Sequence, residues 1–327
     1  MIGGYQTVKQ HSLPGFFDQA LKSRPIIVFS IDVILLVVFS FMSKYFLTVE
    51  NFEAMGYGIL SVGIVSIGMM IVMITGGFDL SVGSTLALTG LLAAEMLHGG
   101  WPIWMAIIGA LLLGGMIGVF NGILITRVKI NPFIATLGTM SMVRGLALAM
   151  SQGRPVSGLP NAFSFLGEGR VFGFPFAILV LVLLVIIADQ VARRTKAARL
   201  FYYVGGNEEA AKLSGIKTKQ VRLAAFVLVG ILAALAGVIW ASRMMSMMPT
   251  AGNGLELKAI AACVVGGASL AGGEGTIIGA FLGTILIAFI DDILILMNVS
   301  SYWQLFSAGA ILVAVVTLDI LIRKIRK

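Results

Sequence analysis

Ionisable residues inside apolar sequence are the first candidates for function, because a charge at the centre of a membrane span costs about 2.5–3.5 kcal/mol on insertion scales. The residues that meet this description are Asp32, Asp79, Glu95, Arg144, Asp291, Asp292 and Asp319. Such groups could relay protons or ions, contact a polar solute, or hold helices together. Asp79 lies beside Ser81 at an expected helix break, so a structural role in capping the next helix is the favoured interpretation for it.

Neutral polar side chains in or beside the apolar runs extend this set. Asn121, Asn131, Thr136 and Thr139 could join helices by hydrogen bonds or line a cavity for a hydroxylated solute. Asp291 and Asp292 could face an outward vestibule or the seam of a homodimer. Arg144 and Glu95 could form a buried pair across helices. The candidate pathway or gate residues are therefore Asp79, Ser81, Asn121, Thr136, Asp291 and Asp292.

No constellation for covalent chemistry is evident in the sequence. His11 and His98 are far apart and Cys263 is the only cysteine, so we expect no metal site and no cofactor bound by this chain. The methionine-rich segment 244–248 suits a gate or a docking surface, and a metal-ion site there is the less favoured alternative. No phosphate-binding loop of the type Gly-x4-Gly-Lys-Ser/Thr occurs, so the chain is predicted not to be an ATPase.

The elements that must position these residues are membrane helices. Of the 327 residues, 58% are hydrophobic and 12% are charged, with a mean hydropathy of +1.01. Lipid must therefore surround most of the chain, and spans of about 20 residues leave room for roughly ten. The predicted fold class is an all-α polytopic membrane protein with about ten transmembrane helices and some broken or re-entrant segments. The expected spans are 25–43, 54–75, 80–98, 102–125, 133–151, 174–192, 221–243, 257–271, 276–296 and 303–321.

Charge and tryptophan positions predict the orientation of these spans. If the N-terminus is cytoplasmic, most of the 23 Lys and Arg residues fall on the cytoplasmic side, with the largest group between Arg193 and Arg222. All four tryptophans then lie near the outer ends of spans, where their rings are favoured. We expect both termini in the cytoplasm, with residues 1–24 as an N-terminal segment, 25–322 as the transmembrane domain and 323–327 as a basic tail. The net charge of +8 reflects topology and predicts no nucleic-acid partner.

Glycine pairs indicate where helices are interrupted. The eighth expected span is only about fifteen residues long and is closed by Gly266-Gly267 and Gly272-Gly273, so it is predicted to be broken or re-entrant. An earlier break is expected at Gly76-Gly77. The two regions share four residues at one constant offset, which leaves chance and internal duplication equally open. Interrupted segments at matching places would mark a transport pathway.

The longest charged segment contains a short helix that ends at Gly215. It reads Asn207-Glu208-Glu209-Ala210-Ala211 and then Lys212 to Gly215. On physical grounds alone, a solvated loop helix without a partner is the favoured interpretation.

Four motifs in order give the chain a resemblance to the permeases of ABC importers, closest to the ribose-type permeases, with arabinose, xylose and autoinducer-2 permeases as relatives. They are 76–84, 205–215, 250–257 and 265–273, and Phe78 stands where many relatives have isoleucine. The resemblance implies that residues 205–216 form a coupling helix, in which Asn207, Glu208, Glu209, Ala210, Ala211 and Gly215 dock on a separate ATPase.

The resemblance also implies the assembly and its location. A cytoplasmic ATPase that uses ATP and Mg, an extracytoplasmic sugar-binding protein and a second permease copy would act together in a bacterial inner membrane. The expected function is alternating-access import of a small sugar, with ribose or another pentose preferred. The main alternative is an ion-coupled secondary sugar transporter, with Asp79, Glu95 and Asp291 as coupling acids. A membrane-embedded enzyme would need a convergent acid/base or metal cluster, which the sequence lacks.

Overall fold

The computed structural model describes residues 24–300 and nine positions between 302 and 317. Seven of its helices are long and apolar enough to cross a membrane. They are α2 (Arg24–Met42), α3 (Val49–Ile74), α5 (Ile103–Thr126), α6 (Pro132–Ser151), α8 (Phe176–Arg194), α11 (Thr218–Met244) and α13 (Ile277–Leu296). The prediction of an all-α polytopic membrane protein is therefore confirmed. The N-terminal segment before residue 24, His11, most of the expected span 303–321, Asp319 and the tail 323–327 lie outside the described residues.

Two further helices are short. α4 (Val82–His98) has 17 residues and α12 (Leu255–Val265) has 11. The segment expected at 257–271 is thus a half-length helix followed by a loop. The charged segment holds two helices, α9 (Lys196–Gly206) and α10 (Glu208–Leu213), where the sequence predicted one over 205–216. Thr195 begins α9 because its side chain accepts a hydrogen bond from the Ala198 amide at 3.2 Å.

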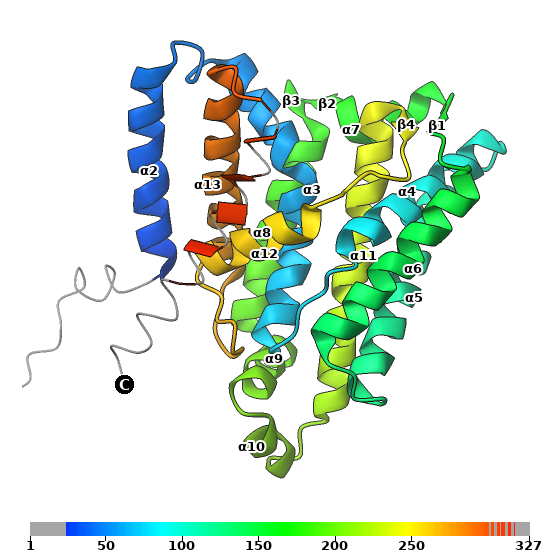
Figure 1. Cartoon of the computed structure of the whole chain (residues 1–327), viewed down its shortest axis with the longest axis vertical. Helices are drawn as coiled ribbons and strands as arrows, with labels where there is room; N and C mark the ends of the chain where they lie inside the picture. Colours follow the sequence, from blue (N-terminus) through cyan, green and yellow to red (C-terminus); the bar gives the residue numbers. More distant parts are fainter. Residues whose placement is uncertain are drawn as a thin grey trace, which may run out of the picture.

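The helices form one bundle with different structures at its two ends (Figure 1). α9 and α10 lie at one end. The opposite end carries the short pairs β1 (Val156–Ser157) with β4 (Ser246–Met247) and β2 (Arg170–Val171) with β3 (Phe174–Pro175), together with η1 (Asn161–Ser164) and α7 (Phe165–Glu168). Both strand pairs are antiparallel, and Val156 lies opposite Met247. Met247 of the methionine-rich segment is completely buried there, whereas Met244 and Met248 are exposed.

α11 is the central helix of the bundle because α3, α4 and α5 all pack against it. Small residues allow the closest of these contacts: a Cβ added at Gly230 of α11 would overlap the Gly114 carbonyl oxygen of α5. Large apolar side chains such as Ile64, Met69 and Leu86 fill the interior of the bundle and are fully buried.

α3 and α12 end in the same Schellman arrangement. Gly76 and Gly77 donate to the carbonyls of Met73 and Val72 at 2.9 and 3.1 Å, and Gly267 and Ala268 donate to Val264 and Cys263 at 3.0 and 2.8 Å. Gly76 and Gly267 have φ of 79° and 95°, so they are the equivalent residues. The constant offset in the sequence pairs Gly76 with Gly266 and not with Gly267. The two helices also differ in length, because α3 has 26 residues and α12 has 11. The structure therefore does not support a duplication in that register.

Candidate pathway and coupling helix

A buried polar cluster lies where the chain leaves α3 and enters α4. One carboxylate oxygen of Asp79 accepts hydrogen bonds from the Ser81 amide at 2.8 Å and the Ser81 hydroxyl at 2.6 Å. Asn121 of α5 donates to the Ser81 hydroxyl at 2.9 Å and lies 3.3 Å from the other Asp79 oxygen. Ser81 is itself the N-cap residue of α4 and makes no side-chain cap. Asp79 therefore organises the turn into α4 through Ser81 and does not cap the helix directly.

Thr136 lies at the edge of this cluster. Its hydroxyl donates to the Pro132 carbonyl of its own helix at 2.8 Å and is 3.5 Å from the Phe78 carbonyl. Two nearby buried atoms, Asn121 Oδ1 and Ser84 Oγ, have no hydrogen-bond partner in the described part of the chain. Since buried polar atoms are normally paired, these two are suited to a polar group that approaches α4 or α5.

The short helices α4 and α12 begin at the same place. A Cβ added at Gly83 would overlap the Gly252 carbonyl oxygen and would lie 2.7 Å from a carboxylate oxygen of Glu256. The two N-termini therefore meet inside the bundle, with the positive ends of both helix dipoles directed at one region. The Glu256 carboxylate, in the first turn of α12, compensates part of that positive potential.

Arg144 holds the extended segment before α12. One terminal guanidinium nitrogen donates to the carbonyls of Pro249 and Ala251 at 2.5 and 2.9 Å. The carboxylate that acts on Arg144 electrostatically is that of Glu256. The hypothesised pair of Arg144 with Glu95 is wrong, because backbone carbonyls satisfy the guanidinium instead.

Asp291 and Asp292 belong to a separate cluster. Asp291 forms an ion pair with Lys258 at 2.6 Å, and Asp292 accepts a hydrogen bond from the side-chain amide nitrogen (Nδ2) of Asn51 at 2.8 Å. All four residues line a cavity of 340 Å³ between α3, α12 and α13. The structure thus brings Asp79, Ser81, Asn121 and Thr136 together and places Asp291 and Asp292 elsewhere.

The second cluster includes residues that the sequence did not single out. Asn51 lies in the first turn of α3, whose N-cap Thr48 accepts from the Asn51 amide at 3.3 Å. Lys258 is a single cation inside an apolar run and could have been flagged by the same criterion as the buried acids.

The helix break residues form a backbone junction with the end of α9. The Gly273 amide donates to the Ile74 carbonyl at 2.8 Å. A Cβ added at Gly205 would overlap that Ile74 oxygen, and one added at Gly272 would lie 3.0 Å from the Gly76 Cα. We call Ile74, Gly76, Gly205, Gly272 and Gly273 the glycine junction. It joins α9 to the end of α3 and to the loop between α12 and α13.

α10 follows this junction and is held by side-chain contacts. Asn207 caps it by accepting from the Ala210 amide at 2.9 Å, and Ala211 is buried against Val204 and Val221. Gly215, with φ of 79°, ends it in a third Schellman arrangement in which Ile216 donates to the Ala211 carbonyl at 3.0 Å. The position and direction of α10 are therefore well defined.

The two acids of α10 differ in their surroundings. Glu208 pairs with Lys212 at 3.1 Å and with Arg222 of α11 at 2.9 Å. Burial raises the pKa of the Glu208 carboxyl, but the hydrogen bond from Lys212 and the charge of Arg222 outweigh it, so the pKa lies below its ordinary value. The Glu209 side chain is 81% exposed, and Leu213 is 90% exposed. Glu208 holds α10 to α11. Glu209 pairs only with Lys212 of its own helix, at 2.9 Å, and forms an exposed face with Leu213.

The family described as branched-chain amino acid transport system / permease component matches residues 54–316. The chain is 38% identical to the ribose import permease protein RbsC of Haemophilus influenzae, over 88% of this chain and 90% of the relative, and 41% identical to that of Bacillus subtilis, over 88% and 89%. It is 36% identical to the autoinducer 2 import system permease protein LsrC of Escherichia coli, over 91% and 87%.

No solved structure matches the chain. The family match covers the short helices α4 and α12, the glycine junction and α10, and the relatives cover nearly the whole chain. The chain belongs to this family of transport-system permease components and is a multi-pass membrane permease.

Proposed function

We propose that this permease is the transmembrane subunit of an ATP-driven ABC importer that moves a small sugar, ribose or another pentose, into the bacterial cytoplasm. Relatives that share 36–41% of their residues over most of the chain are named for ribose and autoinducer 2 import. The broader family description names branched-chain amino acids. We weigh the specific names above the general description, because they belong to proteins aligned over nearly the whole chain.

The observation that carries the coupling part of this proposal is the glycine junction. Backbone packs on backbone there without an intervening side chain, so a displacement of α9 and α10 moves the end of α3 directly. Gly76 and Asp79 follow at once along the chain. A force on α10 therefore reaches the polar cluster through only a few residues.

The face of α10 suits a protein partner. Leu213 and Glu209 are one helical turn apart and exposed, so an apolar and an acidic side chain lie side by side on the accessible face of α10. We propose that Glu209, Ala210, Leu213 and the turn at Gly215 contact a separate cytoplasmic ATPase that uses ATP and Mg. In this proposal Asn207, Glu208 and Ala211 do not contact the ATPase, and their contacts within the permease hold α10 in place.

The proposed topology has ten spans and both termini in the cytoplasm, so that α9 and α10 face the cytoplasm. The basic residues at the junction of α8 and α9 support this orientation, as does Trp240 near the end of α11 that leads to β4. Residues 25–322 form the transmembrane domain in this scheme. The strand-bearing end then faces the extracytoplasmic sugar-binding protein.

The proposed transport cycle is alternating access around the meeting point of α4 and α12. The first polar cluster includes the residues that lead into α4, and the second includes Lys258 in the first turn of α12. Tilting of the two short helices, α4 and α12, would expose one cluster and then the other to the sugar. A second copy of the permease completes the assembly, and the chain itself binds no cofactor in this proposal.

The first experiment is purification from membranes in mild detergent, with identification of the bound proteins by mass spectrometry. A cytoplasmic ATPase should co-purify with the wild type and be lost from the Leu213→Asp and Glu209→Lys variants. The Lys219→Gln variant, which changes an exposed charge of α11 outside α10, is the control.

Reconstitution separates the proposed function from its alternative. Sugar uptake into proteoliposomes should require ATP, the ATPase and the binding protein. Uptake by the purified permease alone, driven by an ion gradient, would instead establish an ion-coupled secondary transporter. The Asp79→Asn variant would then lose coupling to the ion.

A further inference from the structure

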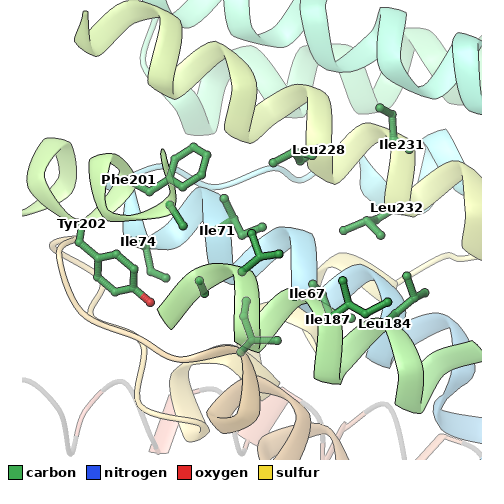
Figure 2. A pocket seen from close by; sticks show the side chains of 15 residues that line it. Ile67, Ile71, Ile74, Leu184, Ile187, Phe201, Tyr202, Leu228, Ile231 and Leu232 are labelled. Carbon is green, nitrogen blue, oxygen red and sulfur yellow. The ribbon is translucent and has the colours of Figure 1, made fainter. Parts of the chain in front are cut away.

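An apolar cavity of 270 Å³ lies between α3, α8, α9 and α11, away from both polar clusters. Figure 2 shows Ile71, Ile187, Phe201 and Leu228 around it. The Tyr202 hydroxyl, at its edge, already donates to the Gly275 carbonyl at 3.1 Å. The cavity therefore offers a sugar no free polar group and is not part of the proposed pathway.

The cavity opens to the side of the bundle that meets lipid. Ile187 and Val191 of the membrane-spanning α8 line it and are 50% and 48% exposed. Exposed apolar side chains at this depth contact hydrocarbon. An occupant of the cavity must therefore present hydrocarbon as well.

A basic rim lies at the α9 end of the cavity. Arg194 follows Ile187 by seven residues and Val191 by three, so it continues the cavity-lining face of α8. Arg199, in the first turn of α9, precedes the lining residue Tyr202 by three residues and so lies on the same side of that helix. Both arginines are exposed, and no carboxylate of the described residues pairs with them. Arg193 differs, because it pairs with Asp189 at 2.6 Å.

We propose that this cavity and its rim bind one anionic phospholipid, with part of an acyl chain in the cavity and the phosphate at Arg194 and Arg199. Charge complementarity selects the occupant: a protein helix would fill the apolar cavity without satisfying the two arginines at its mouth, for which the described part of the chain supplies no carboxylate. Arginine binds phosphate through two parallel donors, and basic pockets between membrane helices are suited to anionic head groups. The volume is near the lower limit of small-molecule pockets, about 300 Å³, so only a segment of one chain enters.

Native mass spectrometry of the purified permease tests this proposal. The protein is incubated in mild detergent with equal amounts of phosphatidylglycerol and phosphatidylcholine, and the retained lipids are counted. The wild type should retain phosphatidylglycerol preferentially. In the Arg194→Gln/Arg199→Gln variant, the preference for phosphatidylglycerol over phosphatidylcholine should fall about five-fold for each arginine removed, the factor expected for one basic residue at an anionic surface. The Lys44→Gln/Arg154→Gln variant removes two exposed charges elsewhere and should keep it.

A second variant tests the hydrocarbon part of the site. Ala188 lines the cavity, and Ala188→Leu would occupy part of it without changing any charge. This variant should retain less of both lipids. Equal retention of the two lipids by the wild type, or an equal loss of preference in the control variant, would overturn the proposal.

Cross-linking tests a different occupant of the same face. Cys263 is the only cysteine and is buried, so an Ile187→Cys variant adds one reactive thiol at the cavity. It should remain monomeric under oxidising conditions in membranes. A disulfide-linked pair of permeases would assign the face to a second copy and refute the lipid site.

Discussion

Replacement of Gly205 by alanine tests the glycine junction with the smallest possible change. The added methyl carbon would overlap the Ile74 carbonyl oxygen and lie 2.8 Å from the Gly273 amide nitrogen. These two atoms form the 2.8 Å hydrogen bond that closes the junction. Overpacking costs about 1–3 kcal/mol, and loss of one backbone hydrogen bond costs about 0.5–1.5 kcal/mol. We therefore expect a loss of about 2–4 kcal/mol, which is large against a typical unfolding free energy of roughly 5–15 kcal/mol.

Gly206 provides the matched control. It is the next residue of α9, and a Cβ added there meets no atom within 4 Å. The Gly206→Ala variant should be as stable as the wild type or gain up to about 1 kcal/mol from helix propensity. The difference between the two variants thus isolates the junction from the general effect of alanine in α9.

Two measurements read out the Gly205 prediction. Thermal unfolding in detergent should show a lower midpoint for Gly205→Ala than for Gly206→Ala. In proteoliposomes with the ATPase and the binding protein, Gly205→Ala should still bind the ATPase, because the α10 face is unchanged, but sugar uptake per ATP hydrolysed should fall. If the two variants have the same unfolding midpoint and the same sugar uptake per ATP hydrolysed, the proposal that a displacement of α9 reaches α3 through these backbone contacts is refuted.

Three further predictions concern α10 and Arg144. Gly215→Val should abolish ATP-dependent uptake while the protein stays in the membrane, because a β-branched residue at φ of 79° costs about 1–2 kcal/mol; Gly215→Asn should retain uptake, and equal uptake by both variants would exclude a role for the turn. Since the folded pKa of Glu208 is lowered, its carboxylate stabilises the fold above the unfolded pKa of about 4.3 and this contribution is lost as pH falls through the folded pKa. Glu208→Gln should therefore lower the free energy of unfolding by at most about 1 kcal/mol at pH 7. If the variant is less stable than the wild type by the same amount at pH 7 and at a pH below the folded pKa, the stabilising role of the Glu208 carboxylate is contradicted. Arg144→Met should destabilise the segment before α12, whereas Glu95→Gln should not; equal losses in thermal unfolding would restore their pairing.

Sequence reasoning located the membrane spans well because each depends on one contiguous property. Apolar runs bounded by polar residues define α2, α3, α5, α6, α8, α11 and α13, and lipid enforces helical structure within them. α9 was missed because its charged residues resemble a loop, and its apolar face matters only when Ala198 and Val204 pack against the bundle.

The site was less predictable because its contacts are formed by tertiary structure. The motif around Asp79 and Ser81 is local, but Asn121 joins them from 40 residues away. Arg144 was assigned an acidic partner because sequence displays side chains and not the backbone carbonyls of an extended segment. Gly205 could be recognised as a glycine in a motif, but the reason for it, the approach of Ile74, becomes visible only in the folded bundle.

The half-length helix α12 has a consequence for membrane insertion. With 11 residues, α12 spans about 16 Å, roughly half of the hydrocarbon thickness of about 30 Å. It also carries Glu256 and Lys258 in its first turn, so it cannot partition into lipid as an independent segment. Its partners are α3, α4 and α13, and two of these precede it in the chain. In the nascent protein, α3 and α4 must therefore already be in place when α12 is synthesised, so that α12 packs against protein and not against lipid. Packing of α12 between α3, α4 and α13 is then a late and obligatory step of biogenesis.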